Sequence, residues 1–271
     1  MLPLAGGLGD LANGVLFFYL TLSAATEWLP IMDFDPSQIP VVQIPLEHGL
    51  THFAQSLVSG KPKIVAIGSS TTAGEGNIKP YPERLLSFLQ TEYPNPRITM
   101  VNEGIGGQEA PVELARFSTD VIAHQPDLVI WQVGTNAVWQ SPDSIPRPPS
   151  LDETTTAIRD GLIQLKGETQ ADIILMDLQY LPAVLTPAKK PKAIEMVDKI
   201  GELARDAGVN VFRRFEFMKR LHEVEKVSFD RMVDPGDDSR LHDSDWVTQR
   251  LACAVKLAIV DGVKKAYANM A

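Results

Sequence analysis

Four hydroxyl side chains in a row, Ser69, Ser70, Thr71 and Thr72, follow the apolar stretch KIVAIG (63–68). A serine or threonine hydroxyl can attack a carbonyl carbon once a neighbouring base accepts its proton. The segment does not fit the G-x-S-x-G elbow, because Thr72 occupies the position that needs glycine. It does not fit a phosphate-binding P-loop either, because no Gly-Lys-Ser/Thr stands at the required spacing. A nucleophile at this place must therefore belong to another arrangement.

Two further loops carry residue types that can stabilise negative charge. The stretch NEGIGG (102–107) is rich in glycine, which lets a backbone N–H approach a ligand closely. It is a weak dinucleotide fingerprint, because Glu109 stands where a third glycine would be required. The stretch GTN (134–136) ends in Asn136, whose carboxamide could donate a hydrogen bond to a developing oxyanion. A turn residue or helix cap is the other interpretation of this asparagine.

A base is also available. The chain contains five histidines, which are His48, His52, His124, His222 and His242. Of these, His242 lies among many acids in DPGDDSRLHDSDW (234–246), and a carboxylate beside a histidine can hold its tautomer and stabilise the imidazolium. We interpret the other four as structural or surface residues. No histidine or cysteine cluster has the spacing of metal ligands, so neither a metal nor a cofactor is expected.

The elements around these loops alternate between strand and helix. Apolar runs predict strands at 63–68, 97–104, 127–136, 171–180 and 209–212, and periodic apolar positions predict helices at 81–93, 152–169, 193–208 and 243–268. This alternation predicts a single three-layer α/β/α domain with a central, mostly parallel five-stranded sheet of the flavodoxin-like type. In such sheets ligands bind beyond the carboxyl ends of the strands, where the loops described above would meet.

Taken in order, these stretches resemble the blocks of the SGNH (GDSL-type) hydrolase superfamily. Gly68-Ser69-Ser70-Thr71-Thr72-Ala73-Gly74 resembles the first block, Gly134-Thr135-Asn136 the third and the region before His242 the fifth. The resemblance covers residues 63 to about 260. It implies that Ser70 is the nucleophile and His242 the base, with an oxyanion hole formed by Ser70, Gly107 and Asn136.

The sequence departs from that pattern at three positions. Ser69 replaces the aspartate of the first block, and Ala137 replaces the aspartate that follows the asparagine of the third. Three residues before His242 stands Ser239, where the family has its acid. We assign the acid of the triad to Asp238, with Asp237 as its rival and Asp234 behind them.

The resemblance implies a serine esterase that acts on short acyl or O-acetyl esters. The loops at 137–150 and 179–192 would form the rim of the site, and in them Trp139, Tyr180, Leu181 and Val184 are candidate substrate-binding residues. Two alternatives remain open within this reading: a thioesterase or lysophospholipase, and a non-catalytic carbohydrate- or ligand-binding protein on the same scaffold. A nucleotide-binding protein using the glycines at 104–107 is the third alternative.

Composition limits the partners. The chain has 271 residues, 25 basic and 34 acidic, with a formal charge of −9, which argues against nucleic acid and anionic membranes as partners.

Residues 46–271 are expected to form the hydrolase-like domain, and residues 1–45 an N-terminal extension. The apolar run 15–25 is too short for stable membrane insertion. It resembles the core of a signal peptide, which would indicate a periplasmic or secreted protein, but a docked arm on a cytoplasmic protein explains it equally well. The sequence does not determine the oligomeric state.

Overall fold

Five short segments pair into one parallel sheet in the computed structural model, which describes residues 42–74 and 76–270. The strands are β1 (Lys63–Gly68), β2 (Thr99–Gly104), β3 (Leu128–Gln132), β4 (Asp172–Met176) and β5 (Asn210–Phe212). Their order is β2-β1-β3-β4-β5, and all four pairings are parallel. The expected five-stranded α/β fold is therefore confirmed. In this order the winding reverses between β1 and β3, which is where ligands bind in open α/β sheets.

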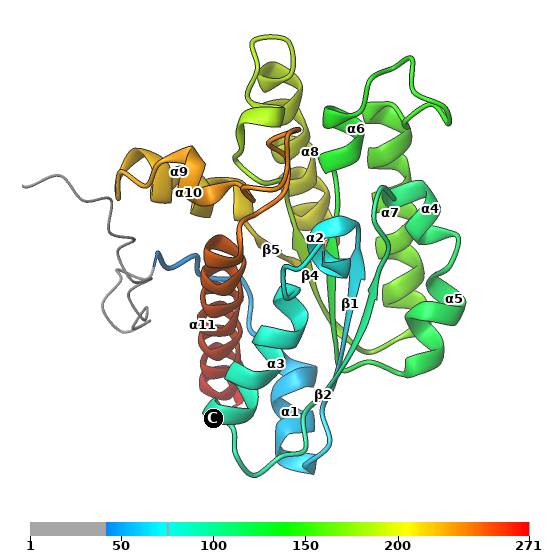
Figure 1. Cartoon of the computed structure of the whole chain (residues 1–271). Coiled ribbons are helices and arrows are strands. Elements are labelled where there is room, and N and C mark those ends of the chain that lie inside the picture. The colour runs from blue at the N-terminus through cyan, green and yellow to red at the C-terminus, as the bar shows by residue number, and fades with distance from the viewer. Residues whose placement is uncertain (1–41, 75, 271) are drawn as a thin grey trace, which may run out of the picture. The chain divides into compact units, whose positions relative to one another are not determined.

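Helices cover both faces of the sheet (Figure 1). One face carries α1 (Thr51–Ser59), α3 (Tyr81–Glu92) and α11 (Asp245–Met270). The other carries α4 (Ala110–Leu114), α5 (Phe117–Asp120), α7 (Leu151–Glu168) and α8 (Lys190–Ala207). The remaining short helices are α2 (Ser70–Ala73), α6 (Thr135–Trp139), α9 (Arg214–Glu223), α10 (Phe229–Met232), η2 (Ile122–His124) and η3 (Pro182–Val184).

Burial along the strands explains their composition. Every residue of β3 is buried, and in β1 only the first residue is not, because helices cover these central strands on both sides. At the edge of the sheet β2 is exposed or half-buried along its whole length, and its sequence TMVNEG is correspondingly more polar. The apolar strands are thus the centre of the core.

The third strand ends earlier than its apolar pattern predicts. We expected a strand over 127–136, but β3 ends at Gln132 and the chain then enters α6. Gly134 has a φ of +94°, a left-handed conformation that glycine adopts without strain and that cannot continue a strand. Asn136 consequently lies in the first turn of a short helix.

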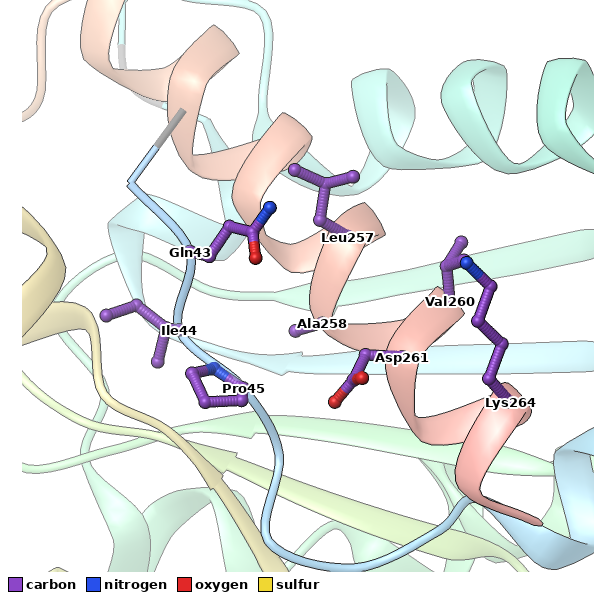
Figure 2. A pocket seen from close by; sticks show the side chains of 8 residues that line it. All are labelled: Gln43, Ile44, Pro45, Leu257, Ala258, Val260, Asp261 and Lys264. Carbon is purple, nitrogen blue, oxygen red and sulfur yellow. The ribbon is translucent and has the colours of Figure 1, made fainter. Parts of the chain in front are cut away.

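Gln43, Ile44 and Pro45 lie beside α11, where they line the pocket shown in Figure 2 together with Leu257 and Lys264. Val42 and Ile44, which belong to the expected extension, are buried in the core together with Leu46. The apolar run 15–25 and most of the expected extension lie outside the described residues. Of the helices that are described, none has the length and apolar character needed to cross a membrane.

Candidate active site

A sharp turn after β1 carries the four hydroxyl residues. We call residues 69–74 the nucleophile turn. It folds into α2 because the carbonyl of Ser69 accepts from the N–H groups of Thr72 and Ala73 at 3.0 and 2.9 Å. The turn lies directly on β2: a Cβ atom added at Gly104 would come within 2.2 Å of the Ala73 nitrogen. Ser70, the predicted nucleophile, begins the helix and is half-buried.

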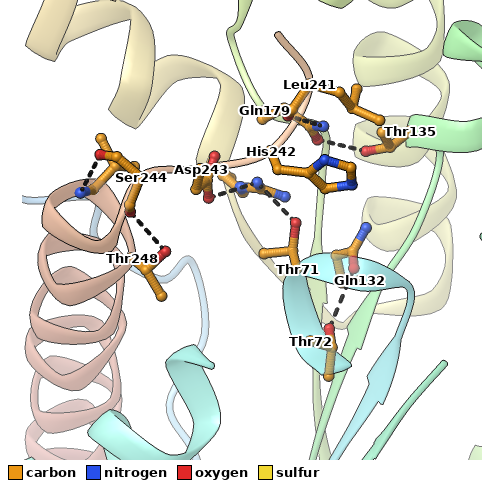
Figure 3. Close-up of polar contacts among 12 residues, drawn as sticks. Thr71, Thr72, Gln132, Thr135, Gln179, Leu241, His242, Asp243, Ser244 and Thr248 are labelled. Atoms are coloured by element: carbon orange, nitrogen blue, oxygen red, sulfur yellow. Dashed lines mark hydrogen bonds and ion pairs between the residues drawn. The ribbon is translucent and has the colours of Figure 1, made fainter. Parts of the chain in front are cut away.

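The side chain of Gln132, at the end of β3, forms hydrogen bonds with this turn (Figure 3). Its Oε1 accepts from the N–H of Ser69 at 3.0 Å and from the hydroxyl of Thr72 at 3.2 Å, and the glutamine is 1% exposed. Sequence reasoning did not assign Gln132 a role. The available signal was a single amide at the end of the otherwise apolar run LVIWQ.

Of the two other predicted oxyanion donors, Gly107 lies in the loop after β2 and Asn136 in the first turn of α6. Asn136 is 3% exposed, and its Nδ2 donates to the carbonyl of Gln108 at 2.7 Å, which fixes the amide. In the part of the chain that the structure describes, no other acceptor takes the second N–H of this amide. Gly107 has a φ of +79° and is exposed. Within residues 42–74 and 76–270, the N–H groups of Ser70 and Gly107 donate to no other protein atom.

Glu109 is a buried carboxylate beneath these loops. It accepts from the N–H of Gly134 at 2.7 Å and from that of Ala137 at 3.1 Å, the two groups that flank Asn136. Burial raises the pKa of Glu109, and these backbone donors offset part of the rise. Burial also raises the pKa of Glu113, which accepts from Trp131 Nε1 at 2.7 Å, and the neighbouring charge of Glu109 raises it further. Glu109 is a second residue that sequence reasoning missed.

The predicted base, His242, has a carboxylate partner. Its Nδ1 lies 3.0 Å from Oδ2 of Asp237, which also accepts from the N–H of His242 at 2.7 Å and from that of Leu241 at 2.8 Å. Burial raises the pKa of Asp237, but hydrogen bonds from Ser239, His242 and Leu241 outweigh this effect and bring it to about 2. Asp237 is therefore ionised at neutral pH.

This contact favours Asp237, the rival candidate, over Asp238 as the carboxylate that pairs with His242. Asp238 is exposed. A tight turn folds the chain back so that Asp237 reaches the histidine. In this turn the N–H of Asp237 donates to the carbonyl of Asp234, and the N–H of Arg240 donates to the carbonyl of Asp237. Asp234 accepts instead from the N–H of Gly236 at 3.0 Å. Asp237 lies five residues before the histidine that it contacts, a spacing that only the folded turn reveals.

The structure brings the predicted nucleophile and base to one place. Ser70 and His242 line the same small pocket, whose other lining residues are Thr71, Gly74, Ile78, Pro80, Asp243 and Thr248. No hydrogen bond joins Ser70 Oγ to the His242 ring in the described part of the chain. In unliganded enzymes such catalytic contacts are commonly loose and tighten when substrate binds.

The loop that carries His242, residues 234–244, which we call the histidine loop, is tied to the sheet by Gln179. The Gln179 Nε2 donates to the carbonyl of Leu241 at 3.2 Å, and its Oε1 accepts from the hydroxyl of Thr135 at 2.7 Å (Figure 3). The glutamine is 2% exposed. It therefore links the neighbour of His242 to the neighbour of Asn136.

Three of the four predicted substrate-binding residues are buried. Leu181 and Val184 are fully buried, and Tyr180 is 6% exposed, packed edge-on against Phe215. The segment after β4 turns into the core instead of forming a rim, so these three side chains have almost no exposed surface to offer a substrate. Trp139 is half-buried at the end of α6 and remains a candidate.

Comparison with known proteins assigns the family. The model of the non-GDSL lipase-like family matches residues 36–265. The chain belongs to this family. The assignment to the SGNH (GDSL-type) superfamily is therefore wrong. The residues agree with this correction, because Ser69 replaces the block aspartate and the acid paired with His242 lies five residues before it.

Known relatives of this non-GDSL lipase-like protein include esterases. An acetylxylan esterase of Geobacillus stearothermophilus is 33% identical over 134 residues, covering 44% of this chain and 60% of that protein, so the match spans less than two thirds of the relative. A solved structure of an acetyl-xylooligosaccharide esterase of Geobacillus, with one tryptophan replaced by isoleucine, is 25% identical with a TM-score of 0.61 and covers 73% of this chain and 94% of the other.

A further similar structure shows the fold alone. It is an α/β hydrolase from the metagenome of Lake Arreo, Spain, which is 19% identical with a TM-score of 0.61 and covers 76% of this chain and 96% of the other. Three other solved structures of the Geobacillus acetylxylan esterase are catalytic mutants with one replacement each. A serine is replaced by alanine in the first, an aspartate in the second and a histidine in the third.

Within the described residues, no three His, Cys, Asp or Glu side chains are grouped so that they could hold a metal ion.

Proposed function

We propose that this protein is a serine esterase that removes short acyl groups, acetyl in the first place, from the hydroxyl groups of a sugar. The observation that carries the proposal is the 3.0 Å contact between His242 Nδ1 and Asp237 Oδ2, made beside a pocket that Ser70 also lines. A hydroxyl, a histidine and a carboxylate that orients the histidine are the groups that acyl transfer through a covalent intermediate requires. Membership of the lipase-like family and similarity to an esterase support it.

The protonation states follow from Asp237. An ionised carboxylate can only accept, so the Nδ1 atom of His242 carries the ring proton and Nε2 presents its lone pair. In the first step Nε2 takes the proton of Ser70 Oγ as this oxygen attacks the ester carbonyl. Asp237 then stabilises the imidazolium without itself taking the proton.

The negative charge that forms on the carbonyl oxygen meets three donors. These are the backbone N–H groups of Ser70 and Gly107 and the free N–H of the Asn136 amide. Collapse of the intermediate expels the alcohol, which receives its proton from His242. A water molecule then repeats the sequence on the acyl-serine, with His242 as base, and releases the carboxylic acid.

The acetylated-sugar substrate is the finer part of the proposal. It is supported by the similarity to an acetylxylan esterase and by a half-buried aromatic side chain, Trp139, one turn after Asn136. The alternative of a non-catalytic binding protein was motivated by Ser239, which stands where the family has its acid. The contact of Asp237 with His242 weakens this alternative, because the histidine has a carboxylate partner. Thioesters and lysophospholipids remain substrates to include in the test.

The proposal is tested with Ser70→Ala and a matched variant, Ser87→Ala, at an exposed position on α3. Wild type and Ser87→Ala should hydrolyse acetylated xylooligosaccharides and p-nitrophenyl acetate, and a fluorophosphonate probe should label both. Ser70→Ala should lose labelling and nearly all turnover. The panel also contains a thioester and a lysophospholipid. Full activity of Ser70→Ala would refute the nucleophile, and a preference for the thioester or lysophospholipid would refute the substrate class.

A further inference from the structure

A buried arginine bridges the two halves of the site. Arg214, the first residue of α9, has a side chain with no exposed surface. Its Nη2 lies 3.0 Å from the hydroxyl of Thr71 and 2.8 Å from Oδ2 of Asp243, which is itself 6% exposed. Thr71 follows Ser70 in the chain, and Asp243 follows His242. One guanidinium group therefore contacts the neighbour of the nucleophile and the neighbour of the base.

We propose that Arg214 is a positioning residue that sets the distance and orientation between Ser70 and His242. The inference rests on the proposed function, since it assigns Arg214 a role in that same site. The histidine loop reaches the nucleophile turn from a distant part of the sequence, and Figure 3 shows Thr71, His242 and Asp243 gathered at this junction. The bonds from Arg214 join the two segments directly.

The position of Arg214 is itself fixed by the sheet. Asp177, directly after β4, accepts from the N–H of Phe215 at 2.8 Å and so anchors the first turn of α9. The guanidinium group therefore belongs to a helix, α9, whose first turn is bonded to the end of β4. Through Arg214, the rigid centre of the sheet defines where the nucleophile turn and the histidine loop meet.

The chemistry of the bridge favours positioning over stability. Burying an ion pair has a desolvation cost that often cancels its attraction, so an apolar pair of similar size would hold a core together equally well. A guanidinium differs from an apolar group because its N–H donors leave a rigid plane in fixed directions. Such a group is suited to holding two acceptors, Thr71 Oγ1 and Asp243 Oδ2, at a set separation.

Two backbone bonds also hold the histidine loop, one within the loop and one to the end of α10. The N–H of Asp234 donates to the carbonyl of His242 at 2.9 Å, and the N–H of Ser244 donates to that of Met232 at 2.8 Å. These bonds fix the shape of the loop, and Gln179 ties it toward Asn136. Arg214 connects the histidine loop to the neighbour of Ser70, because its Nη2 bonds Asp243 in the loop and Thr71 in the nucleophile turn. Removing the bond from Arg214 to Thr71 should let the base drift relative to the nucleophile while the fold persists.

The sharpest test is Thr71→Val, which deletes one hydroxyl and keeps the shape of the side chain. The matched control is Thr154→Val, at a buried threonine of α7 whose hydroxyl bonds the carbonyl of Ser150 far from this pocket. Thr71→Ser, which keeps the hydroxyl, is the conservative variant. For each protein we would measure kcat, KM, the rate of fluorophosphonate labelling and Tm. The concentration of active sites, which is needed for kcat, would be titrated from the acyl burst.

Small errors in the placement of reacting groups cost up to about 100-fold in rate. We therefore expect Thr71→Val to lower both kcat and the labelling rate by roughly 10- to 100-fold with little change in KM, and Thr71→Ser to recover most of this loss. Thr154→Val should keep wild-type kcat. Thr71→Val with wild-type kcat and labelling would overturn the inference. If Ser70→Ala is inactive in the same assay, the proposed function stands even then; if Ser70→Ala is active, the proposed function itself fails.

Discussion

The Nδ1 atom of His242 lies 3.0 Å from a carboxylate oxygen of Asp237, five residues earlier in the chain. The same oxygen accepts two backbone N–H groups, so the carboxylate is held rigidly while it orients the ring. We predict that Asp237→Asn lowers kcat by about 10³- to 10⁴-fold, because an amide can donate to Nδ1 and so favour the unproductive tautomer. Steady-state kinetics on p-nitrophenyl acetate would measure the loss.

The control for this variant is its neighbour. Asp238→Asn changes the same functional group at an exposed position that does not contact the histidine. It should leave kcat within about twofold of wild type, the range expected of a surface substitution. Equal losses in the two variants would contradict the assignment of Asp237.

Asn136 should contribute to the transition state and little to substrate binding. Its Nδ2 bonds the carbonyl of Gln108, and the remaining N–H is free to meet the oxyanion. Losing one such donor costs roughly 10²- to 10³-fold in turnover, so Asn136→Ala should lower kcat by that factor with KM nearly unchanged. A rise in KM at constant kcat would instead assign Asn136 to ground-state binding.

Gln132 should support the nucleophile turn through buried hydrogen bonds. Replacing it by leucine leaves the N–H of Ser69 and the hydroxyl of Thr72 without their acceptor. We expect a loss of about 1–3 kcal/mol in the free energy of unfolding, measured in urea, together with a lower kcat. Gln164→Leu, on the outer part of α7, is the control and should change neither quantity.

Asp177 should make stability depend on pH. Burial raises its pKa from 3.8 to about 7, against the lowering effects of the Phe215 N–H and of Arg213 and Arg214. Between these two values the folded state binds more protons than the unfolded state, so this group lowers stability as pH rises from about 4 to about 7. Asparagine does not titrate and keeps an oxygen for the Phe215 N–H.

The free energy of unfolding of Asp177→Asn, relative to wild type, should therefore rise between pH 4.5 and pH 7.5. The expected size of the rise is on the order of 1–4 kcal/mol, since one pKa unit corresponds to about 1.4 kcal/mol. The exposed variant Asp160→Asn should show no such change with pH. A constant difference between Asp177→Asn and wild type at both pH values would contradict the raised pKa.

Trp139 should distinguish large substrates from small ones. It is half-buried at the end of α6, with the Lys189 ammonium 5.9 Å from its ring centroid. If a sugar packs on this ring, Trp139→Ala should raise KM for an acetylated xylooligosaccharide by about three- to tenfold, the value of one aromatic contact. KM for p-nitrophenyl acetate should not change in the same protein, which serves as its own control.

Local sequence pattern was sufficient to predict most of the helices and strands. The run KIVAIG predicted β1 to the residue, and the helices α3, α7, α8 and α11 lie within three residues of their expected ends. Ser70 and His242, the nucleophile and base that the family resemblance implies, line one pocket in the structure. The end of β3 was misplaced, since the apolar run continues past Gln132 while the left-handed Gly134 stops the strand.

The rim could not be predicted in the same way. Tyr180, Leu181 and Val184 follow β4, where the carboxyl ends of strands meet, yet the chain there turns inward and buries all three. A run of apolar residues is equally compatible with an apolar binding rim and with a core, and only the packing of neighbouring segments distinguishes them.

The sequence by itself determined the layered α/β fold, the order of the loops and the residue types that could perform acyl transfer, because strand and helix periodicity and local turn chemistry act over a few residues. Only the tertiary structure decided that Asp237, and not Asp238, pairs with His242, and that Gln132, Gln179, Glu109 and Arg214 join the loops beneath the site. These contacts connect positions that are five to 143 residues apart. Their partners depend on how the chain turns in space, which no local periodicity records.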